Sequence, residues 1–194
     1  VGEGELFVAI PGTKLDGAQF VDDALDRGAA VIVSEEAPSS DRRCAWVRVK
    51  NARAALAAIA ANYYEHPSAR LKLIGITGTN GKTTTSLLEE SILTHQGFSV
   101  GVLGTLAYRW RDQVRKAPMT TPDALELQKL FCEMLRSGVS HVVMEVSSHA
   151  LALGRVDGCA FGAALFTNLS QDHLDFHQNM ESYYQAKALL FREL

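Results

Sequence analysis

The chain has 194 residues, of which 47% are hydrophobic, and a formal net charge of -3. This composition is typical of a globular protein, and the near-neutral balance gives no indication of a nucleic-acid surface. No apolar run approaches the roughly 18 residues of a membrane span, and the first residues lack a signal-peptide pattern. Cys44, Cys132 and Cys159 form no CxxC pair, so we expect buried or idle thiols in a reducing cytoplasm. We also expect the protein to be a monomer.

The first part of the chain predicts a small α/β unit. Short apolar runs predict three strands, over residues 6–10, 29–33 and 46–49. Apolar residues at helical spacing and an alanine-rich segment predict two helices, over 18–27 and 52–64. The sequence His66-Pro67-Ser68 breaks the second helix, so we place a domain boundary there and assign residues 1–68 to the first domain.

In the second domain, residues 69–194, strands and helices alternate more strictly. Apolar runs predict four strands, over 71–76, 99–103, 141–146 and 163–167. Three helices are predicted, over 83–95, 122–136 and 180–194. This alternation is typical of a parallel sheet with helices on both faces. Because four strands make a thin sheet for a nucleotide-binding domain, we expect this domain to be incomplete.

A glycine-rich turn joins the strand at 71–76 to the helix that follows. It reads Gly78-Thr79-Asn80-Gly81-Lys82-Thr83, with Thr84 next. Glycines let backbone N–H groups point at phosphate oxygens, and the helix N-terminus adds positive charge. We therefore predict that Lys82 reaches the β- and γ-phosphates of ATP and that the Thr83 hydroxyl binds Mg²⁺.

The spacing of this loop is shorter than the standard G-x-x-x-x-G-K-[ST] pattern. Counting back from Gly81, the first glycine of that pattern would fall at Ile76. The other interpretation is a glycine-rich turn followed by a chance Lys-Thr. The strand, loop and helix nevertheless fall where a phosphate site needs them, which favours nucleotide binding.

Polar residues follow the third predicted strand. Glu145 ends that strand, at the edge of the sheet where ligands bind in doubly wound folds. It could hold the magnesium of a nucleotide, or be a capping or solvated carboxylate. Ser147, Ser148 and His149 could suggest a hydrolase nucleophile, but no G-x-S-x-G motif surrounds them. We therefore expect a capping or substrate-binding role there.

The fourth predicted strand leads into a segment, 168–177, that is dense in side chains able to bind metals. Asp172, His173, Asp175 and His177 lie in it, without the spacing of a known zinc site. We expect a polar loop with one or two magnesium contacts, and a single histidine in it could equally serve in ordinary hydrogen bonding.

Three further positions have simple structural explanations when each is taken alone. The sequence Thr120-Thr121-Pro122-Asp123 could be the N-cap of the helix after it. Lys187 would be a solvated lysine within its helix, and Arg155 carries no signal in isolation.

Taken together, these motifs resemble the Mur ligases of bacterial cell-wall synthesis, and the resemblance covers the whole chain. The segment Gly4–Ala9 with Asp16-Gly17 is similar to the family's UDP-substrate domain. The loop from Gly78 to Thr84 is similar to the family's short phosphate loop, which accounts for its spacing. Residues 145–151 and 167–175 are similar to the branch that adds the third amino acid of the peptide.

The resemblance implies an ATP-dependent amide ligase of peptidoglycan precursor synthesis. The D-glutamyl carboxylate of UDP-N-acetylmuramoyl-L-alanyl-D-glutamate attacks the γ-phosphate of ATP, and the acyl phosphate reacts with the amine of meso-diaminopimelate or L-lysine. The chain would then hold an N-terminally incomplete UDP-muramoyl domain and a C-terminally incomplete central domain with a P-loop ATPase-type sheet. Without the family's C-terminal domain, we expect the chain to be inactive as it stands.

The same resemblance assigns roles to individual residues. Lys82 and the loop amides bind the phosphates and offset charge during phosphoryl transfer. Thr83 and Glu145 hold one Mg²⁺, and His173 contributes to a second metal site. Lys187 matches a carbamylated lysine, whose modification turns a cation into an anion that can bind magnesium. Four residues match contacts to the muramoyl dipeptide: Thr120, Thr121, Ser147 and Arg155.

Three other functions compete with this one. A folylpolyglutamate synthetase shares the ATPase fold and the modified lysine, but the UDP-type domain argues against it. A nucleotide-binding module without chemistry would not need Glu145, His173 and Lys187 together. The third possibility is a fragment that binds nothing.

Overall fold

The structure is a computed structural model that describes residues 1–12, 15–37 and 44–192. It divides into two compact units, Val1–Ile59 and Ala60–Leu194. The division falls inside the helix α2 (Ala52–Tyr63), before the boundary predicted at residues 66–68. The assignment of substrate-binding and ATP-binding domains to residues 1–68 and 69–194 remains a prediction.

The first unit contains a parallel three-stranded sheet in the order β1-β2-β3. Its elements are β1 (Leu6–Val8), η1 (Gly17–Phe20), α1 (Val21–Asp26), β2 (Val31–Ser34) and β3 (Ala45–Arg48). The helix predicted over 18–27 begins as a 3₁₀ turn, because Asp16 caps it by accepting the Ala18 N–H at 2.9 Å. Ala24, Ala29 and Ile32 form the buried core, where α1 packs against the sheet.

The second unit is built on a six-stranded sheet in the order β7-β6-β5-β8-β4-β9. Its strands are β4 (Lys72–Thr77), β5 (Val100–Leu103), β6 (Ala107–Trp110), β7 (Gln113–Lys116), β8 (His141–Glu145) and β9 (Phe161–Phe166). The four predicted strands are parallel, as expected. The expected count of four is wrong, since β6 and β7 form an antiparallel hairpin beside β5.

The hairpin of β6 and β7 was not predicted from the sequence, because its second strand, β7, has no apolar run. Only Val114 in β7 is aliphatic, and it is exposed. In β6 the apolar residues alternate with others, so Tyr108 and Trp110 point into the core on either side of Arg109. The turn is made at Arg111, whose positive φ of 50° gives no signal in an arginine.

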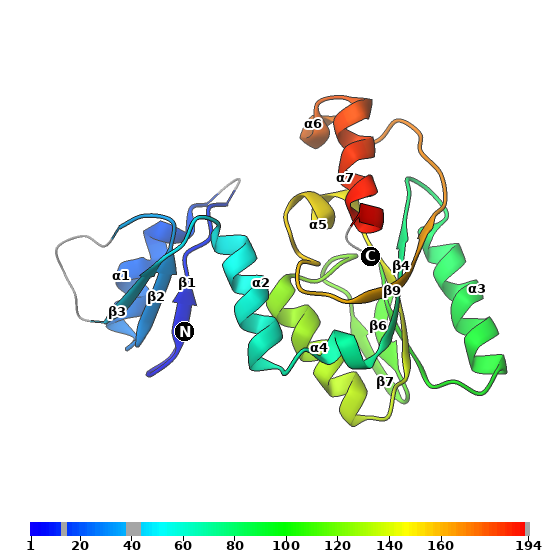
Figure 1. Ribbon diagram of the computed structural model, residues 1–194, viewed down its shortest axis with the longest axis horizontal. Coiled ribbons are helices and arrows are strands. Elements are labelled where there is room, and N and C mark those ends of the chain that lie inside the picture. The colour runs from blue at the N-terminus through cyan, green and yellow to red at the C-terminus, as the bar shows by residue number, and fades with distance from the viewer. Residues whose placement is uncertain (13–14, 38–43, 193–194) are drawn as a thin grey trace. The chain divides into compact units, whose positions relative to one another are not determined.

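Helices cover both faces of this sheet. They are η2 (Pro67–Arg70), α3 (Lys82–His95), α4 (Ala124–Arg136), α5 (Ser148–Ala152), α6 (Leu174–His177) and α7 (Met180–Arg192). Figure 1 shows α3 on one face of the sheet and α4 on the other. The apolar stripe of α4, Leu127, Leu130, Phe131 and Met134, is fully buried in the main core. The predicted α/β class, a parallel sheet with helices on both faces, is confirmed.

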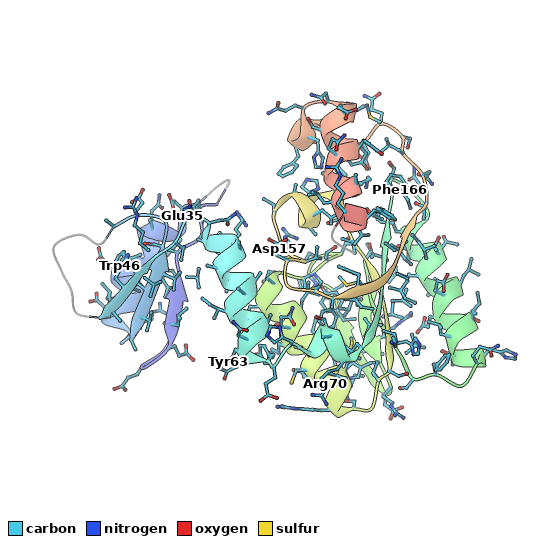
Figure 2. The ribbon with its side chains drawn as sticks, in the orientation of Figure 1. Glu35, Trp46, Tyr63, Arg70, Asp157 and Phe166 are labelled. Atoms are coloured by element: carbon cyan, nitrogen blue, oxygen red, sulfur yellow. The ribbon has the colours of Figure 1, made fainter. Side chains whose placement is uncertain are left out.

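Strand β9 lies at one edge of the sheet, and its side chains are less buried than those of β4 and β8. Leu165 and Phe166 are each about a third exposed, and the Phe166 ring lies 6.0 Å from the ring of Phe191 on α7. Phe166 is labelled in Figure 2. None of the helices in the described part of the chain is long and apolar enough to cross a membrane.

The hairpin leads to a prediction for alkaline pH. Tyr108 is buried and donates a hydrogen bond to Met119 O at 2.6 Å. Burial raises the pKa of Tyr108 from 10.0 to about 12. Between these pH values the unfolded chain releases the tyrosyl proton and the folded chain keeps it, so the free energy of unfolding falls as pH rises. We expect Tyr108→Phe to lessen this fall by roughly 1–2 kcal/mol in urea unfolding.

The matched control is Tyr184→Phe, because Tyr184 is exposed on α7. It should keep the wild-type dependence on pH. If Tyr108→Phe keeps it as well, Tyr108 has no raised pKa.

Candidate functional site

The loop after β4 has the backbone that phosphate binding needs. Gly78 has a φ of +143° and Gly81 has a φ of +84°, where α3 begins. A side chain at Gly78 would overlap the Thr167 hydroxyl, so this glycine is required by both its conformation and its surroundings. The expected backbone freedom of both glycines is confirmed by these angles, and their role in binding phosphate remains a prediction.

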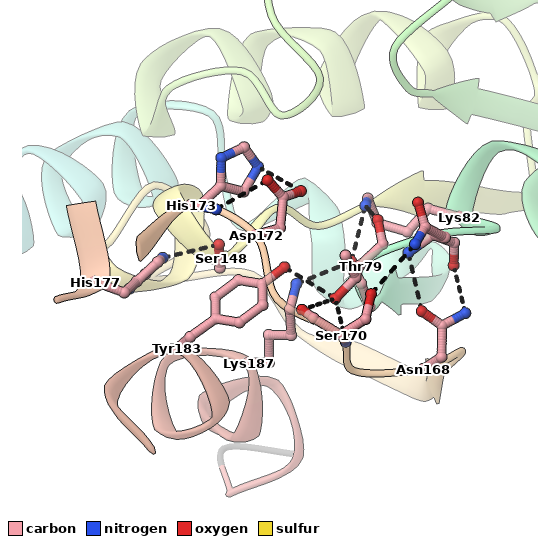
Figure 3. A network of polar contacts seen from close by, with 12 residues as sticks. Thr79, Lys82, Ser148, Asn168, Ser170, Asp172, His173, His177, Tyr183 and Lys187 are labelled. Atoms are coloured by element: carbon pink, nitrogen blue, oxygen red, sulfur yellow. Dashed lines mark hydrogen bonds and ion pairs between the residues drawn. The ribbon is translucent and has the colours of Figure 1, made fainter. Parts of the chain in front are cut away.

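The segment after β9 holds this loop in place. The Asn168 side chain accepts the Asn80 N–H at 3.0 Å and donates to Asn80 O at 3.0 Å. The Thr79 N–H donates to Asn168 O at 2.9 Å, and Thr167 Oγ1 donates to Asn80 O at 2.7 Å. Figure 3 shows Asn168 beside the loop. The motif at 167–170 therefore orders the phosphate loop, in addition to any contact with ligand.

Lys82 folds back over the loop. Its Nζ donates to Gly78 O at 2.8 Å and to Thr79 O at 3.0 Å. Burial lowers the pKa of Lys82, while the nearby Glu145 carboxylate acts in the opposite direction. The ammonium is thus held at the loop by neutral carbonyls, where an incoming phosphate can attract it.

Glu145 lies at the carboxyl end of β8 and is 1% exposed. Its carboxylate accepts from Thr83 Oγ1 at 2.9 and 3.0 Å, and from the N–H and hydroxyl of Thr105 at 3.1 Å each. The alternative of a solvated carboxylate is wrong. All of these donors are neutral, so a buried negative charge stands beside the loop with no cationic partner among these contacts.

This donor set fits a magnesium ion. Mg²⁺ prefers hard oxygen ligands and takes only one or two carboxylates from a protein, with phosphate and water completing its shell. The Thr83 hydroxyl and the Glu145 carboxylate are in contact, and both line the same cavity. They would hold the ion where it offsets the charge of a bound phosphate.

The cavity has a volume of about 300 Å³ and an open mouth. Besides the phosphate loop it is lined by Thr105, Thr120, Glu145, Ser147 and His173. Most of the predicted site residues therefore line one cavity. The predicted residues that are not in its wall are Gly78, Thr121, Arg155 and Lys187. Thr105 was not predicted, although its position directly after a parallel strand was a usable signal.

The predicted dipeptide contacts are placed around Thr121. Thr121 Oγ1 donates to Glu145 O at 2.9 Å and accepts the Ser147 N–H at 3.0 Å. Ser147 caps α5 by accepting the Ala150 N–H, while Asp123 is the N-cap of α4. Arg155 donates to Thr121 O at 3.2 Å. The expected capping role of Ser147 is confirmed. The N-cap expected in the sequence Thr120-Thr121-Pro122-Asp123 is also confirmed, with Asp123 as the capping residue.

Lys187 is buried, with 1% exposure, so the interpretation as a solvated lysine is wrong. Its Nζ donates to Gly78 O at 2.9 Å, and the same carbonyl accepts from Lys82. Burial, followed by the charge of Lys82, lowers the pKa of Lys187 to about 8. As an ammonium it cannot ligate a cation, so its predicted role as a modified metal ligand remains a prediction.

His173 lies in a cluster of aromatic rings. It has a positive φ of 52°, and its ring lies 4.8 Å from that of His149 and 6.3 Å from that of Tyr183. His177 is buried and hydrogen-bonds Ser148 at 2.9 Å. In the described part of the chain, no three His, Cys, Asp or Glu residues are grouped as a metal site. A second metal at His173 therefore stays a prediction.

Glu145 yields a test of the magnesium site. Glu145→Gln keeps the size of the side chain but removes its charge, so we expect magnesium-dependent nucleotide binding to weaken by about tenfold or more. Titration calorimetry with and without Mg²⁺ measures this difference. Glu181→Gln, at an exposed position on α7, is the control and should bind as the wild type does. Equal magnesium dependence in both variants would contradict the assignment.

The Mur ligase middle domain matches residues 76–194, which is more than half of the chain. The Mur ligase family, catalytic domain, matches residues 1–64. The chain belongs to the Mur ligase family. The family assignment made from the sequence motifs is thereby confirmed.

Individual Mur ligases match almost the whole chain. A curated UDP-N-acetylmuramoyl-L-alanyl-D-glutamate–2,6-diaminopimelate ligase of Solibacter usitatus is 50% identical over 191 residues, which is 98% of this chain and 39% of the relative. A ligase of the same name from Clostridium acetobutylicum is 48% identical over 99% of the chain and 40% of the relative. The chain thus spans about two-fifths of the length of these Mur ligases.

Solved Mur ligase structures share the fold. A structure of a UDP-N-acetylmuramoyl-L-alanyl-D-glutamate–2,6-diaminopimelate ligase has a TM-score of 0.83 and 30% identity, and the match covers 100% of this chain and 39% of that one. MurF ligase from Thermotoga maritima, in complex with ADP, has a TM-score of 0.63 and 23% identity, with 100% and 41% covered.

Proposed function

We propose that the protein carrying this chain is an ATP-dependent ligase of peptidoglycan precursor synthesis. It would add 2,6-diaminopimelate to UDP-N-acetylmuramoyl-L-alanyl-D-glutamate, the reaction that the names of its relatives describe. The observation that carries this proposal is the phosphate loop, with Lys82 and the contact between Thr83 and the buried Glu145, in a chain that aligns with the first of those relatives over 98% of its length.

The geometry supports phosphoryl transfer. Lys82 and the loop N–H groups would bind the β- and γ-phosphates and offset the charge that develops as the bond to the leaving ADP breaks. Thr83 and Glu145 would hold Mg²⁺, which supplies further positive charge at the phosphates. The substrate carboxylate attacks the γ-phosphorus and becomes an acyl phosphate. The incoming amine then attacks the acyl carbon, and inorganic phosphate leaves.

The remaining site residues would position the substrate carboxylate. Thr120 and Ser147 line the cavity next to the loop. Arg155 reaches Thr121 O, and its planar guanidinium has further donors for a carboxylate or phosphate. Lys187 in carbamylated form and His173 would hold a second metal ion. The family branch supports these roles, and the shared cavity supports those of Thr120, Ser147 and His173.

We also propose a division of labour between the domains. Residues 1–68 would bind the UDP-muramoyl part of the substrate, and residues 69–194 would bind ATP. The match of residues 1–64 to the family supports the first assignment. The first unit also contains a cavity of about 260 Å³, with Asp16, Ser34 and Trp46 in its wall. The protein would act as a monomer in the cytoplasm, where ATP and the soluble nucleotide precursor occur together.

An amide-ligation assay on the complete protein tests the proposal. The assay contains ATP, Mg²⁺, UDP-N-acetylmuramoyl-L-alanyl-D-glutamate and either meso-diaminopimelate or L-lysine, with the product measured by mass. We expect product with diaminopimelate. If product forms with L-lysine alone, the added amino acid is lysine and not diaminopimelate. If neither amino acid gives product, the proposed function is refuted. The 194-residue chain alone should form none.

Folylpolyglutamate synthetase is the less favoured alternative. The E. coli FolC structure with DHPP and ADP has a TM-score of 0.51 and covers 70% of the chain, at 22% identity. The diaminopimelate ligase structure covers the first unit as well. A nucleotide-binding module without chemistry is also less favoured, because plain binding does not require both a buried Glu145 and a buried Lys187 near the loop.

A further inference from the structure

Tyr183 lies where α7 meets the phosphate loop, and none of the roles assigned above uses it. Its side chain is 1% exposed. Its hydroxyl lies 3.2 Å from Thr79 Oγ1 in the loop, and Lys187 Nζ lies 4.5 Å from the centroid of its ring. A single side chain therefore contacts both the loop and the second lysine, as Figure 3 shows.

The hydrogen bonds around Thr79 determine the direction of the tyrosine contact. A threonine hydroxyl has one proton and two lone pairs. Thr79 Oγ1 donates its proton to Ser170 O at 3.1 Å and accepts the Ser170 N–H at 3.0 Å. The remaining lone pair is available to Tyr183, which therefore donates. Burial raises the pKa of Tyr183, which keeps this donor protonated.

The ring of Tyr183 acts on Lys187. Both residues lie on α7, four positions apart, so they share one side of the helix. The negative face of the ring attracts the ammonium and compensates part of the cost of burying it. The centroid of the His177 ring lies 5.1 Å from that of the Tyr183 ring, and Tyr183 is buried.

We propose that Tyr183 is a positioning residue of the phosphate site. Its hydroxyl fixes Thr79 and thus the loop, and its ring holds the unmodified Lys187 ammonium against the Gly78 carbonyl. The proposal rests on the proposed function in one respect, namely that this loop binds the phosphates of ATP. Tyr183→Phe removes only the hydroxyl contact, whereas Tyr183→Leu removes the hydroxyl and the aromatic face.

Amide hydrogen exchange in the nucleotide-free chain tests the hydroxyl contact. The reporting amides are Thr79, Asn80 and Ser170, each bonded within the loop and its partner segment. We expect Tyr183→Phe to speed their exchange by about threefold to tenfold, the effect of one neutral hydrogen bond, with amides in β8 unchanged. The matched control is Tyr184→Phe, next to it on α7 and exposed.

A double-mutant cycle shows whether the effect passes through Thr79. Thr79→Val removes the acceptor, so adding Tyr183→Phe to it should speed exchange no further. Additive effects would overturn the proposal, and so would loop exchange equal to that of the wild type. If exchange in β8 rises by the same factor as in the loop, Tyr183 serves only global stability and the proposal also fails.

Steady-state ligation kinetics of the complete protein test the role of Tyr183 in ATP binding and catalysis. Tyr183→Phe should raise the KM for ATP by about the factor seen in exchange and leave kcat nearly unchanged. Tyr183→Leu should lower kcat as well, because the unmodified Lys187 loses the ring that holds its side chain beside the loop. An unchanged KM in an active Tyr183→Phe protein refutes the positioning role alone. If the wild-type protein shows no ligation activity, the proposed function is refuted. The hydrogen-exchange measurements then still test whether Tyr183 positions the loop.

Discussion

Lys82→Met is expected to lower the ligation rate of the complete protein by about 100-fold or more, the usual effect of removing a group that stabilises transition-state charge. Among the described residues that line the cavity, Lys82 is the one lysine, and no arginine joins it. Its Nζ is already at the loop, on the Gly78 and Thr79 carbonyls. Methionine keeps much of the apolar stem, so the folded state should lose about 1 kcal/mol or less.

Two measurements separate these effects. Ligation kinetics give the change in kcat/KM for ATP, and urea unfolding gives the change in stability. Lys129→Met, at a solvent-exposed position on α4 that pairs with Glu126 at 4.0 Å, is the matched control and should retain full activity. Full activity of the Lys82→Met protein would contradict the role of the Lys82 ammonium in phosphoryl transfer.

Gly78→Ala is expected to lower the free energy of unfolding by roughly 3 kcal/mol or more, through steric overlap added to backbone strain. The new methyl group would overlap Thr167 Oγ1 and approach the Asn168 N and O atoms at 3.1 Å each. Because the Asn168 backbone belongs to the segment that orders the loop, it cannot move without loss of those hydrogen bonds.

Gly97→Ala is a matched control for the part of the loss that comes from placing alanine in a left-handed backbone conformation. Gly97 also has a positive φ, +83°, but nothing lies within 4 Å of its added methyl group. Gly97→Ala should therefore lower the free energy of unfolding by only about 1–2 kcal/mol, which is the cost of a left-handed conformation in a residue other than glycine. Urea unfolding of both variants measures the difference. Equal losses would show that Thr167 and Asn168 do not constrain the loop.

The elements with strong local signals could be predicted from the sequence. The four parallel strands carry continuous apolar runs, and Gly78, Lys82 and Thr83 follow one of them directly. Glu145 was found because the carboxyl ends of parallel strands converge at one edge. The hairpin of β6 and β7 could not be found in this way, since β7 is largely polar and its partner strand, not its own sequence, defines it.

The burial of the inward-facing side chains could not be derived from the sequence pattern, because it depends on contacts between distant segments. Lys187 was assigned to the site only through the family resemblance, and Tyr183 was not predicted. Lys187 and Tyr183 lie on a helix more than 100 positions after the loop that they touch. Their spacing on α7 shows that they share one side of the helix but not which side is buried. The helices at 148–152 and 174–177 were missed because each is about one turn long.

The edge strand β9 has a practical consequence. Among the described residues no strand pairs with its outer side, which is flanked by the exposed side chains of Leu165 and Phe166. Such an edge is a template on which another β-strand can add, whether from a partner or from a second copy of the chain. Samples of the 194-residue chain should therefore be kept dilute. A charged residue placed on β9 should reduce self-association through this edge.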